Sequence, residues 1–501
     1  MRIVLFNIAH SSIALSILGA MAKKEGHVTE LIHAPTIFKD GLIREIKWLS
    51  RLFNMDQKLF EEVEAFKPDL IAFSVVTYHY QQALYYAEQC KKVCPNAKIV
   101  FGGIHVSFVP EIVIAHDFID YVVIGEGEPA FPEIIKHIQK GESSKPIVNT
   151  WYKTKDKEII KGKQVGFVQD LDALPQYDFT FWEKLNPPKA LPYYPTMTSR
   201  GCPYNCTYCF NHFFRNIPEE KSNYVRRRSV KHVMDELTFY KKRYNIQAIE
   251  FWDDIFIYDK KWLKEFLEAY KKEVAIPFKC YIHVNIFDED IAMWLKDAGC
   301  RWVDFGIQHI NEDYRKKYLK RNETNENIIN ALKLLKKYGI VSFADYIVAM
   351  PGDTIEYNEE ARQFFLENMP DIIEPYWMSY HPKTEIIQKG FEHDILTDEI
   401  LDSIQQGFRH SYFEDGLGAQ DFHKEYYFIF KVLPSLPAFL RPRLTYAVSK
   451  KIPYFIKILL YAYSILYLYF KHNNIRVTVV LVNYPREMMR ILKLKYFSKK
   501  K

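Results

Sequence analysis

Residues 198–211 read TSRGCPYNCTYCFN, and Cys202, Cys206 and Cys209 within this stretch follow a CxxxCxxC spacing. Glycine, proline and asparagine lie between or beside the cysteines, and these turn formers predict a loop rather than a helix. Three thiolates on one tight loop can bind three irons of a cubane iron–sulfur cluster and leave the fourth iron open. A structural zinc site would need a fourth ligand, for which His212 is a nearby candidate. The spacing favours the iron–sulfur cluster over zinc.

The loop belongs to a chain of 501 residues, which is too long for a single core and predicts two or three domains. A hydrophobic content of 48% with 26% charged residues excludes wholesale disorder. The net charge of +6 is mild, and basic residues gather at 226–228 and in the tail, so we expect no nucleic-acid partner. Seven cysteines, three of them clustered, suit a reducing compartment. Polar residues interrupt the apolar start of the chain, which favours a strand–helix unit over a secretion signal and predicts a cytoplasmic protein.

Residues 1–145 alternate between short apolar runs and amphipathic patterns. This alternation predicts a doubly wound parallel sheet, a Rossmann-like domain. The expected strands are 2–6, 28–33, 70–74, 99–102 and 121–124, and the expected helices are 13–24, 80–93, 109–115 and 128–138. Ligands of such sheets bind at the carboxyl ends of the strands. Those ends carry Ser74, Thr77, Gly102, Gly103, His105, Gly125, Glu126 and Glu128. Taken singly, the glycines could be tight turns and the glutamates a solvated helix start.

Residues 191–400 show a second, regular alternation. With the apolar run 191–197 as its first strand, the segment predicts six β/α units. The other expected strands are 248–253, 278–284, 302–307, 342–348 and 372–379, and the expected helices are 229–244, 261–272, 289–298, 326–338 and 354–368. Residues 146–190 are expected to form a linker that contains an exposed hairpin at 151–166.

The cysteine motif, with the aromatic Tyr208 before its last cysteine, resembles the signature of the radical S-adenosylmethionine (SAM) superfamily. Six β/α units fit the open partial TIM-type barrel of that superfamily. The resemblance implies a 4Fe–4S cluster on Cys202, Cys206 and Cys209, with SAM on the open iron. It also implies an external one-electron reductant of the flavodoxin or ferredoxin type. By the same resemblance the candidate SAM-binding residues are Tyr208, Asp253, Asp254 and Gln308.

Three segments of the first domain resemble, in order, the cobalamin-binding domain that precedes many radical SAM domains. They are DLIAFS at 69–74, GGIH at 102–105 and GEGE at 125–128. The resemblance implies that Ser74, Thr77, Gly102, Gly103, His105, Gly125, Glu126 and Glu128 contact cobalamin. The DxHxxG motif that supplies a histidine to cobalt is absent, and His10 lacks its neighbouring Asp and Gly, so we expect no histidine ligand on cobalt.

Together these motifs resemble the class B radical SAM methylases. The resemblance implies methylation of an unactivated carbon, or of a phosphinate phosphorus, in a small-molecule, lipid or natural-product substrate. In that scheme a 5′-deoxyadenosyl radical activates the substrate, and cobalamin delivers a methyl group that a second SAM restores. A cobalamin-dependent rearrangement or ring-forming reaction is the alternative. A non-catalytic cobalamin-binding module is a remote alternative, because it leaves the three cysteines unexplained.

Residues 401–501 lose the alternation and predict a mostly helical extension rich in aromatic and basic residues. The run 452–470 is apolar but contains Lys457 and several tyrosines, so it is a marginal candidate for a membrane-spanning helix. A buried helix of a small α-helical cap is the favoured interpretation. The alternative is a peripheral membrane helix, which the basic residues Lys450, Lys451 and Lys471 would flank.

Overall fold

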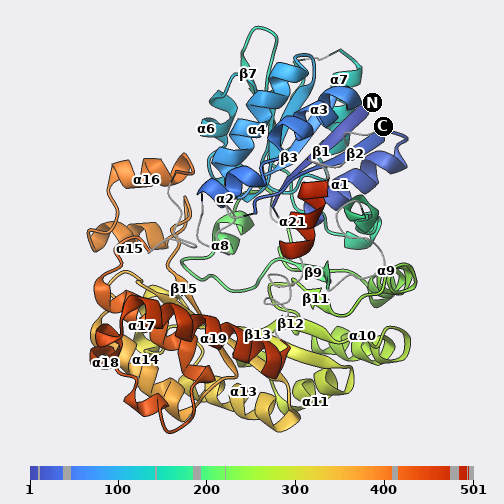
Figure 1. The fold of residues 1–501 in the computed structure, drawn as a ribbon. Coiled ribbons are helices and arrows are strands. Elements are labelled where there is room, and N and C mark those ends of the chain that lie inside the picture. Colours follow the sequence, from blue (N-terminus) through green and yellow to red (C-terminus); the bar gives the residue numbers. More distant parts are fainter. Residues whose placement is uncertain are drawn as a thin grey trace.

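The computed structural model describes residues 1–9, 12–37, 47–141, 144–183, 193–220, 222–408, 416–473, 484–493 and 495. Two α/β units, each built on one sheet, face each other (Figure 1). The expectations for His10, for residues 184–190 of the linker and for the beginning of the first barrel strand at 191–192 lie outside the described residues.

The N-terminal unit is built on a seven-stranded sheet of order β2-β1-β3-β4-β5-β6-β7. Its strands are β1 (Arg2–Ile8), β2 (Val28–Ala34), β3 (Leu70–Ser74), β4 (Lys98–Gly102), β5 (Tyr121–Val123), β6 (Thr150–Lys153) and β7 (Ile159–Lys161). Strands β1 to β5 run parallel, as their continuous apolar runs predict for strands that are buried on both faces. The expected hairpin is β6–β7, and it also pairs with β5 in antiparallel fashion, so it extends the sheet.

Helices cover this sheet on both faces. They are α1 (Ile13–Lys24), α2 (Lys47–Leu52), α3 (Asp56–Phe66), α4 (Tyr80–Val93), α5 (Ile104–Phe108), α6 (Pro110–Ala115) and α7 (Phe131–Gln139). The sequence patterns predict α1 and α4 with their observed bounds, because each buries a clear apolar stripe. They miss α3, which buries only Leu59 and Val63 of its own residues. The helix expected at 109–115 is α6, which begins at Pro110, whereas the short helix α5 before it was not predicted.

The second unit is a six-stranded, all-parallel sheet of order β15-β14-β13-β12-β11-β8. Its strands are β8 (Tyr194–Thr196), β11 (Ile249–Phe251), β12 (Phe278–Ile282), β13 (Cys300–Gln308), β14 (Val341–Val348) and β15 (Ile372–Trp377). Strands β8 and β15 lie at opposite edges of this order, so the described sheet is an open partial barrel. The predicted partial barrel is therefore confirmed.

Helices alternate with these strands and cover the outside of the barrel (Figure 1). They are α9 (Val230–Arg243), α10 (Lys260–Glu273), α11 (Glu289–Asp297), α13 (Asn325–Tyr338) and α14 (Ile355–Glu367). The short α12 (Glu312–Tyr318) precedes α13, and α15 (Ile386–Glu392) and α16 (Asp398–Gln405) follow β15 beside the N-terminal unit. Helices α9, α10, α11 and α14 begin after side chains that accept a backbone N–H of the first turn, namely Ser229, Asp259, Asp288 and Thr354. The cysteine loop lies between β8 and α9 and includes β9 (Ser199–Arg200), α8 (Phe210–Arg215) and β10 (Arg226–Arg227).

The described tail is helical, as predicted. It contains α17 (Asp421–Val432), α18 (Tyr446–Lys451), α19 (Tyr454–His472) and α21 (Tyr484–Leu492). Helix α19 packs on α17 and on the barrel, where Leu468 joins a cluster with Trp302, Phe343 and Ile372. Helix α21 returns to the N-terminal unit and buries Ile491 in its core. None of the helices in the described part of the chain is long and apolar enough to cross a membrane.

Candidate functional site

The two units meet at the carboxyl ends of their strands, and buried ion pairs join them there. Arg200, just before the cysteines, places its guanidinium 3.0 Å from Glu126 Oε1 and 2.5 Å from Glu128 Oε1. Arg226 lies 2.8 Å from Glu126 Oε1. Burial opposes ionisation of Glu128, but Arg200 outweighs this effect and lowers the pKa of its carboxyl group. The two glutamates of the GEGE segment therefore connect the N-terminal unit to the cysteine loop.

The three cysteines lie on a loop, as predicted. Cys206 is buried, whereas Cys202 and Cys209 are partly exposed. The Cys209 N–H donates to the Cys206 carbonyl oxygen at 3.1 Å, which makes a tight turn. Gly201 has a φ of +85°, and a Cβ there would lie 2.2 Å from the Tyr224 carbonyl oxygen. The backbone just before the first cysteine therefore requires glycine.

Burial raises the pKa of the Cys202 thiol to about 11 and that of the Cys209 thiol to about 12. The free thiols therefore retain their protons at neutral pH, and metal binding would release them. Across the described ranges, no group of three or more His, Cys, Asp or Glu side chains is arranged to hold a metal ion. A cluster on this loop therefore requires the three sulfurs to turn toward a common centre.

Polar hydrogens approach two of the three sulfurs, which suits an iron–sulfur cluster. Arg321 Nη1 lies 3.8 Å from Cys206 Sγ and 3.1 Å from the Tyr208 hydroxyl oxygen. Asn211 Nδ2 lies 3.6 Å from Cys209 Sγ. Hydrogen bonds to cysteine sulfurs stabilise clusters and tune their reduction potentials. The donor set therefore fits the implied 4Fe–4S cluster.

Arg321 is a site residue that sequence reasoning missed. It is buried in the loop before α13, and it also donates to the Gly306 carbonyl oxygen at 2.8 Å and to Glu323. No local motif marks it, because its contact with Cys206 joins residues 115 positions apart. His212, the candidate fourth zinc ligand, places its Nε2 atom 2.9 Å from Glu385 Oε1.

Asp253, a predicted SAM-binding residue, lies behind the cysteine loop with 1% of its surface exposed. Its carboxylate accepts the Thr198 hydroxyl at 2.6 Å, the Thr198 N–H at 3.1 Å and the Ser199 hydroxyl. These contacts anchor the chain that leads into the cysteines. A direct contact of Asp253 with SAM stays a prediction.

Asp254 and Gln308, two further predicted SAM-binding residues, lie at strand ends of the barrel. Asp254 accepts the Asn211 side-chain amide at 2.9 Å, and burial raises the pKa of its carboxyl group. Gln308 ends β13 with a φ of +66°, where the register with β14 shifts. Asn211 contacts Cys209 Sγ and also donates to Asp254, whereas Tyr208 is connected to Cys206 through Arg321. Tyr208, Asp254 and Asn211 therefore all lie near the sulfurs.

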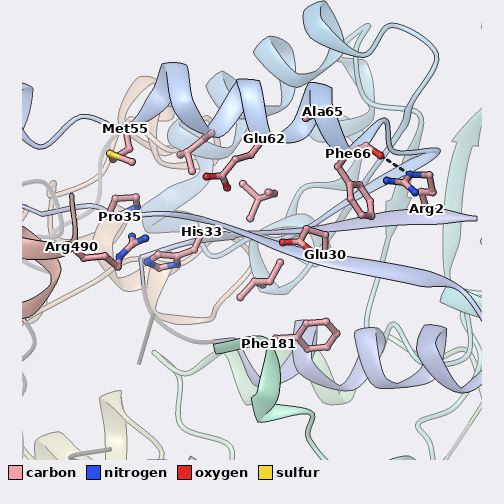
Figure 2. Close-up of a pocket in the computed structure, with 13 residues that line it drawn as sticks. Arg2, Glu30, His33, Pro35, Met55, Glu62, Ala65, Phe66, Phe181 and Arg490 are labelled. Carbon is pink, nitrogen blue, oxygen red and sulfur yellow. Dashed lines mark hydrogen bonds between the residues drawn. The ribbon is translucent and has the colours of Figure 1, made fainter. Parts of the chain in front are cut away.

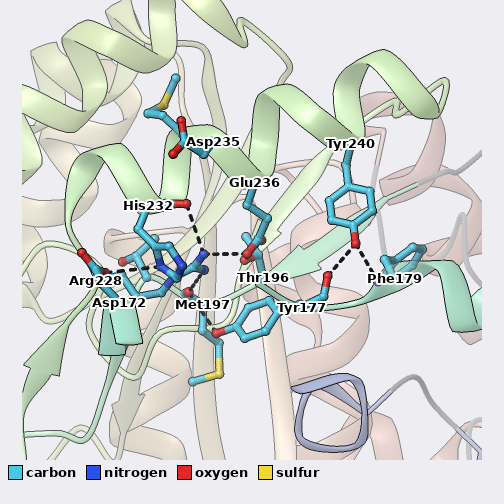
Figure 3. A network of polar contacts seen from close by, with 12 residues as sticks. Asp172, Tyr177, Phe179, Thr196, Met197, Arg228, His232, Asp235, Glu236 and Tyr240 are labelled. Atoms are coloured by element: carbon cyan, nitrogen blue, oxygen red, sulfur yellow. Dashed lines mark hydrogen bonds and ion pairs between the residues drawn. The ribbon is translucent and has the colours of Figure 1, made fainter. Parts of the chain in front are cut away.

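A buried network supports the strand that feeds the loop (Figure 3). Glu236 of α9 accepts the Tyr194 hydroxyl at 3.0 Å and the Thr196 hydroxyl at 2.7 Å, both from β8. Arg228 lies 2.6 Å from the same carboxylate and donates to the Met197 carbonyl oxygen at 2.9 Å. The network holds β8 and α9 together on either side of the cysteine loop.

The predicted cobalamin contacts line the carboxyl edge of the N-terminal sheet. Gly103 has a φ of +103°, and a Cβ there would lie 2.7 Å from the backbone N and O of Val75. His105 Nδ1 lies 3.1 Å from Thr77 Oγ1, its ring packs on Tyr80, and burial lowers its pKa to about 4. Ser74 is exposed at the end of β3. Gly103 therefore allows this turn to pack on the Val75 backbone, and Ser74 offers an exposed hydroxyl at this edge that a cofactor of the implied kind could reach. The individual cobalamin contacts stay predictions.

Residues that follow β15 extend from the barrel over this edge. The Gln406 carbonyl oxygen accepts Gln81 Nε2 at 2.5 Å, and a Cβ on Gly407 would lie 2.9 Å from the Tyr80 ring. His381 stacks on Phe108, with ring planes 9° apart. The residues before α15 and after α16 thus pack on the first turn of α4 and on α5, beside the carboxyl ends of β3 and β4.

A cavity of about 530 Å³ lies elsewhere, between β2 and α3 of the N-terminal unit (Figure 2). Its charged lining comes from Arg2, Glu30, Glu62 and Arg490. None of the sequence-predicted site residues lines it, so it is separate from the interface described above.

Comparison with known proteins identifies the same two units. The model of the B12 binding domain matches residues 4–135, and that of the radical SAM superfamily matches residues 196–365. An uncharacterized methyltransferase of Pyrococcus horikoshii is 29% identical over 70% of this chain and 72% of its own length. The anaerobic magnesium-protoporphyrin IX monomethyl ester cyclase of Rubrivivax gelatinosus is 25% identical, over 70% of this chain and 61% of the cyclase.

Among solved structures, the cobalamin-dependent SAM radical enzyme OxsB has the same fold. Its TM-score is 0.66 at 16% identity, and the match covers 98% of this chain and 75% of OxsB. The two family models together imply SAM, a 4Fe–4S cluster and cobalamin as cofactors. The chain thus combines a B12-binding domain with a radical SAM domain, which identifies it as a cobalamin-dependent radical SAM enzyme.

Proposed function

We propose that the protein is a methyltransferase that acts on an unactivated carbon, or on a phosphinate phosphorus, of a small molecule. The observation that carries the proposal is the interface between the two units. The ion pairs of Arg200 with Glu126 and Glu128 hold the cysteine loop against the edge lined by Gly103 and His105. A methyl donor on one side and a radical source on the other would thus lie at the same interface.

The residues of the proposed site have separate roles. Cys202, Cys206 and Cys209 would hold the 4Fe–4S cluster, and SAM would bind beside it. When bound, the three cofactors supply hydrogen abstraction by a radical and a transferable methyl group. Arg321 and Asn211 donate toward the cysteine sulfurs and orient the loop. The residues before α15 and after α16 pack on α4 and α5 and so help to hold the barrel against the N-terminal unit.

The relatives support methyl transfer, and they also favour one alternative. The Pyrococcus relative is named a methyltransferase, and so is the bacteriochlorophyllide relative of Chlorobaculum tepidum, which is 25% identical over 66% of this chain. The Rubrivivax relative is named a cyclase, so ring formation without methyl transfer is the second candidate. The substrate class that we propose is a small molecule, which includes lipids and other natural products.

Product analysis separates the two candidates. The anaerobically reconstituted protein would receive cobalamin, methyl-labelled SAM, a flavodoxin or ferredoxin reductant and extract from cells that lack the protein. Methyl transfer should yield 5′-deoxyadenosine and S-adenosylhomocysteine in about equal amounts, with the label in a new product. Omission of cobalamin should stop labelling while some SAM cleavage continues. 5′-Deoxyadenosine without S-adenosylhomocysteine would exclude methyl transfer and favour ring formation or rearrangement.

A further inference from the structure

Helix α19 exposes an apolar stripe on the side that faces away from the barrel. Phe455 is 64% exposed, Leu459 63% and Phe470 78%. Further exposed members at helical spacing are Ile458, Tyr463 and Leu466. The outward face of a helix on a globular protein is ordinarily polar, and contiguous apolar patches mark interaction sites.

Contacts on the opposite face fix this orientation. Leu468 packs on Trp302 and its neighbours, and the Trp302 indole N–H donates to the His472 carbonyl oxygen at 3.0 Å. Ser464 donates to the Lys431 carbonyl oxygen at 3.0 Å, and Lys457 lies 2.5 Å from Glu425 Oε1. These contacts hold the helix at both ends and at its centre, so the stripe cannot turn inward without breaking them.

The segment of the chain that carries the stripe has charges of one sign. No Asp or Glu occurs in the sequence from Tyr426 to Arg486. Lys450 and Lys451 are exposed just before α19, and Lys471 is exposed at its end. An apolar, aromatic helix face flanked by lysines matches the boundary of a bilayer that contains anionic lipids. A partner protein of ordinary mixed charge would not account for the absence of acidic residues.

We propose that the α19 stripe binds the surface of a bilayer that contains anionic lipids. The helix lies in the interfacial plane, because none of the described helices, α19 included, is long and apolar enough to cross a membrane. Leu468 packs beside residues that begin barrel strands, whereas the cysteine loop follows the carboxyl end of β8. The contact therefore lies at the end of the barrel opposite the proposed active site and anchors the enzyme without covering that site.

Vesicle flotation of the full chain tests this proposal. Wild-type protein should float with vesicles of equimolar phosphatidylglycerol and phosphatidylcholine, and should float far less with phosphatidylcholine alone. The Phe455→Ser/Phe470→Ser variant should lose flotation. Phe239→Ser is the matched control, because Phe239 is 50% exposed on α9, outside the stripe, and should float like wild type.

A second variant tests the charge separately. Lys450→Glu/Lys451→Glu should weaken partitioning to the anionic vesicles by more than about fivefold, since each cation near such a surface strengthens binding by roughly that factor. Unchanged thermal melting would show that the variants remain folded. Equal flotation of wild type and the Phe455→Ser/Phe470→Ser variant would overturn the proposal. So would wild-type protein that stays off both vesicles but forms a dimer that this variant dissociates, because a second copy would then cover the stripe.

Discussion

Replacement of Arg200 by Gln should weaken the connection between the two units and lower the free energy of unfolding more than the loss of an exposed ion pair does. Arg200 bonds Glu126 at 3.0 Å and Glu128 at 2.5 Å, and the two glutamate side chains are each 8% exposed. Removal of one partner from a buried ion pair costs about 3–5 kcal/mol, because a buried charge is left unpaired. Arg226 still bonds Glu126, so we expect a loss near the lower limit, about 3 kcal/mol.

The assay is urea unfolding followed by tryptophan fluorescence, with a double-mutant cycle. The Glu128→Gln/Arg200→Gln variant should lose less stability than the sum of its single variants, with a coupling of about 2 kcal/mol. The exposed pair of Lys163 and Glu220, 2.6 Å apart, is the control, and Lys163→Gln should leave the unfolding midpoint unchanged. A loss under about 1 kcal/mol for Arg200→Gln, with no coupling, would refute the interpretation of these contacts as a buried clamp.

Acidification supplies an independent check of the same pair. Arg200 keeps the pKa of Glu128 below its ordinary value in the folded protein. This contribution to stability is therefore complete above the ordinary carboxyl pKa and disappears as the pH falls through the folded value. The difference in stability between wild type and Arg200→Gln should narrow as the pH falls. A constant difference in stability across this pH range would show that the pKa of the Glu128 carboxyl group does not depend on Arg200.

Three further predictions concern the cofactors. Cys206→Ala should lose most of the about four irons and four sulfides bound by the reconstituted protein, and stoichiometric zinc without sulfide in the wild type would contradict the cluster assignment. Arg321→Gln should keep its iron but lower the cluster's reduction potential in an EPR-monitored titration, because a buried positive charge 3.8 Å from Cys206 Sγ is removed. Arg321→Lys should restore part of this shift in potential. An unchanged potential in Arg321→Gln would exclude an influence of Arg321 on the cluster. Gly103→Val should weaken hydroxocobalamin binding, because its Cβ would lie 2.7 Å from the Val75 backbone, whereas Gly141→Ala, with open space around it, should bind normally.

Much of the fold was predictable because it depends on local patterns. The strands at 2–8 and 70–74 contain the continuous apolar runs 3–6 and 70–73, and such runs predict strands that are buried on both faces. The cysteine loop was equally predictable, since turn formers and the three thiols lie within a few residues of one another. Helix α3 was not, because only two of its own side chains are buried and no capping side chain marks its beginning.

The roles of individual site residues depended on contacts between distant parts of the chain. The sequence motif marked Glu126 and Glu128 as cobalamin contacts, but the structure bonds both to Arg200, more than seventy positions away. Their contact with cobalamin stays a prediction, whereas their ion pairs are part of the fold. Arg321 reaches Cys206 across a similar separation and carries no motif of its own.

The tail also has features that the sequence determines and others that depend on tertiary packing. Its composition determined that 452–470 would be an apolar helix with lysines at both ends. Only the tertiary structure decided which face is buried, because Leu468, Ser464 and the end of α19 dock on the barrel and on α17. Periodicity and turn chemistry act between neighbours along the chain, so the sequence alone determines them. The partner of a buried charge, and the side of a helix that faces solvent, are decided only when distant segments pack together.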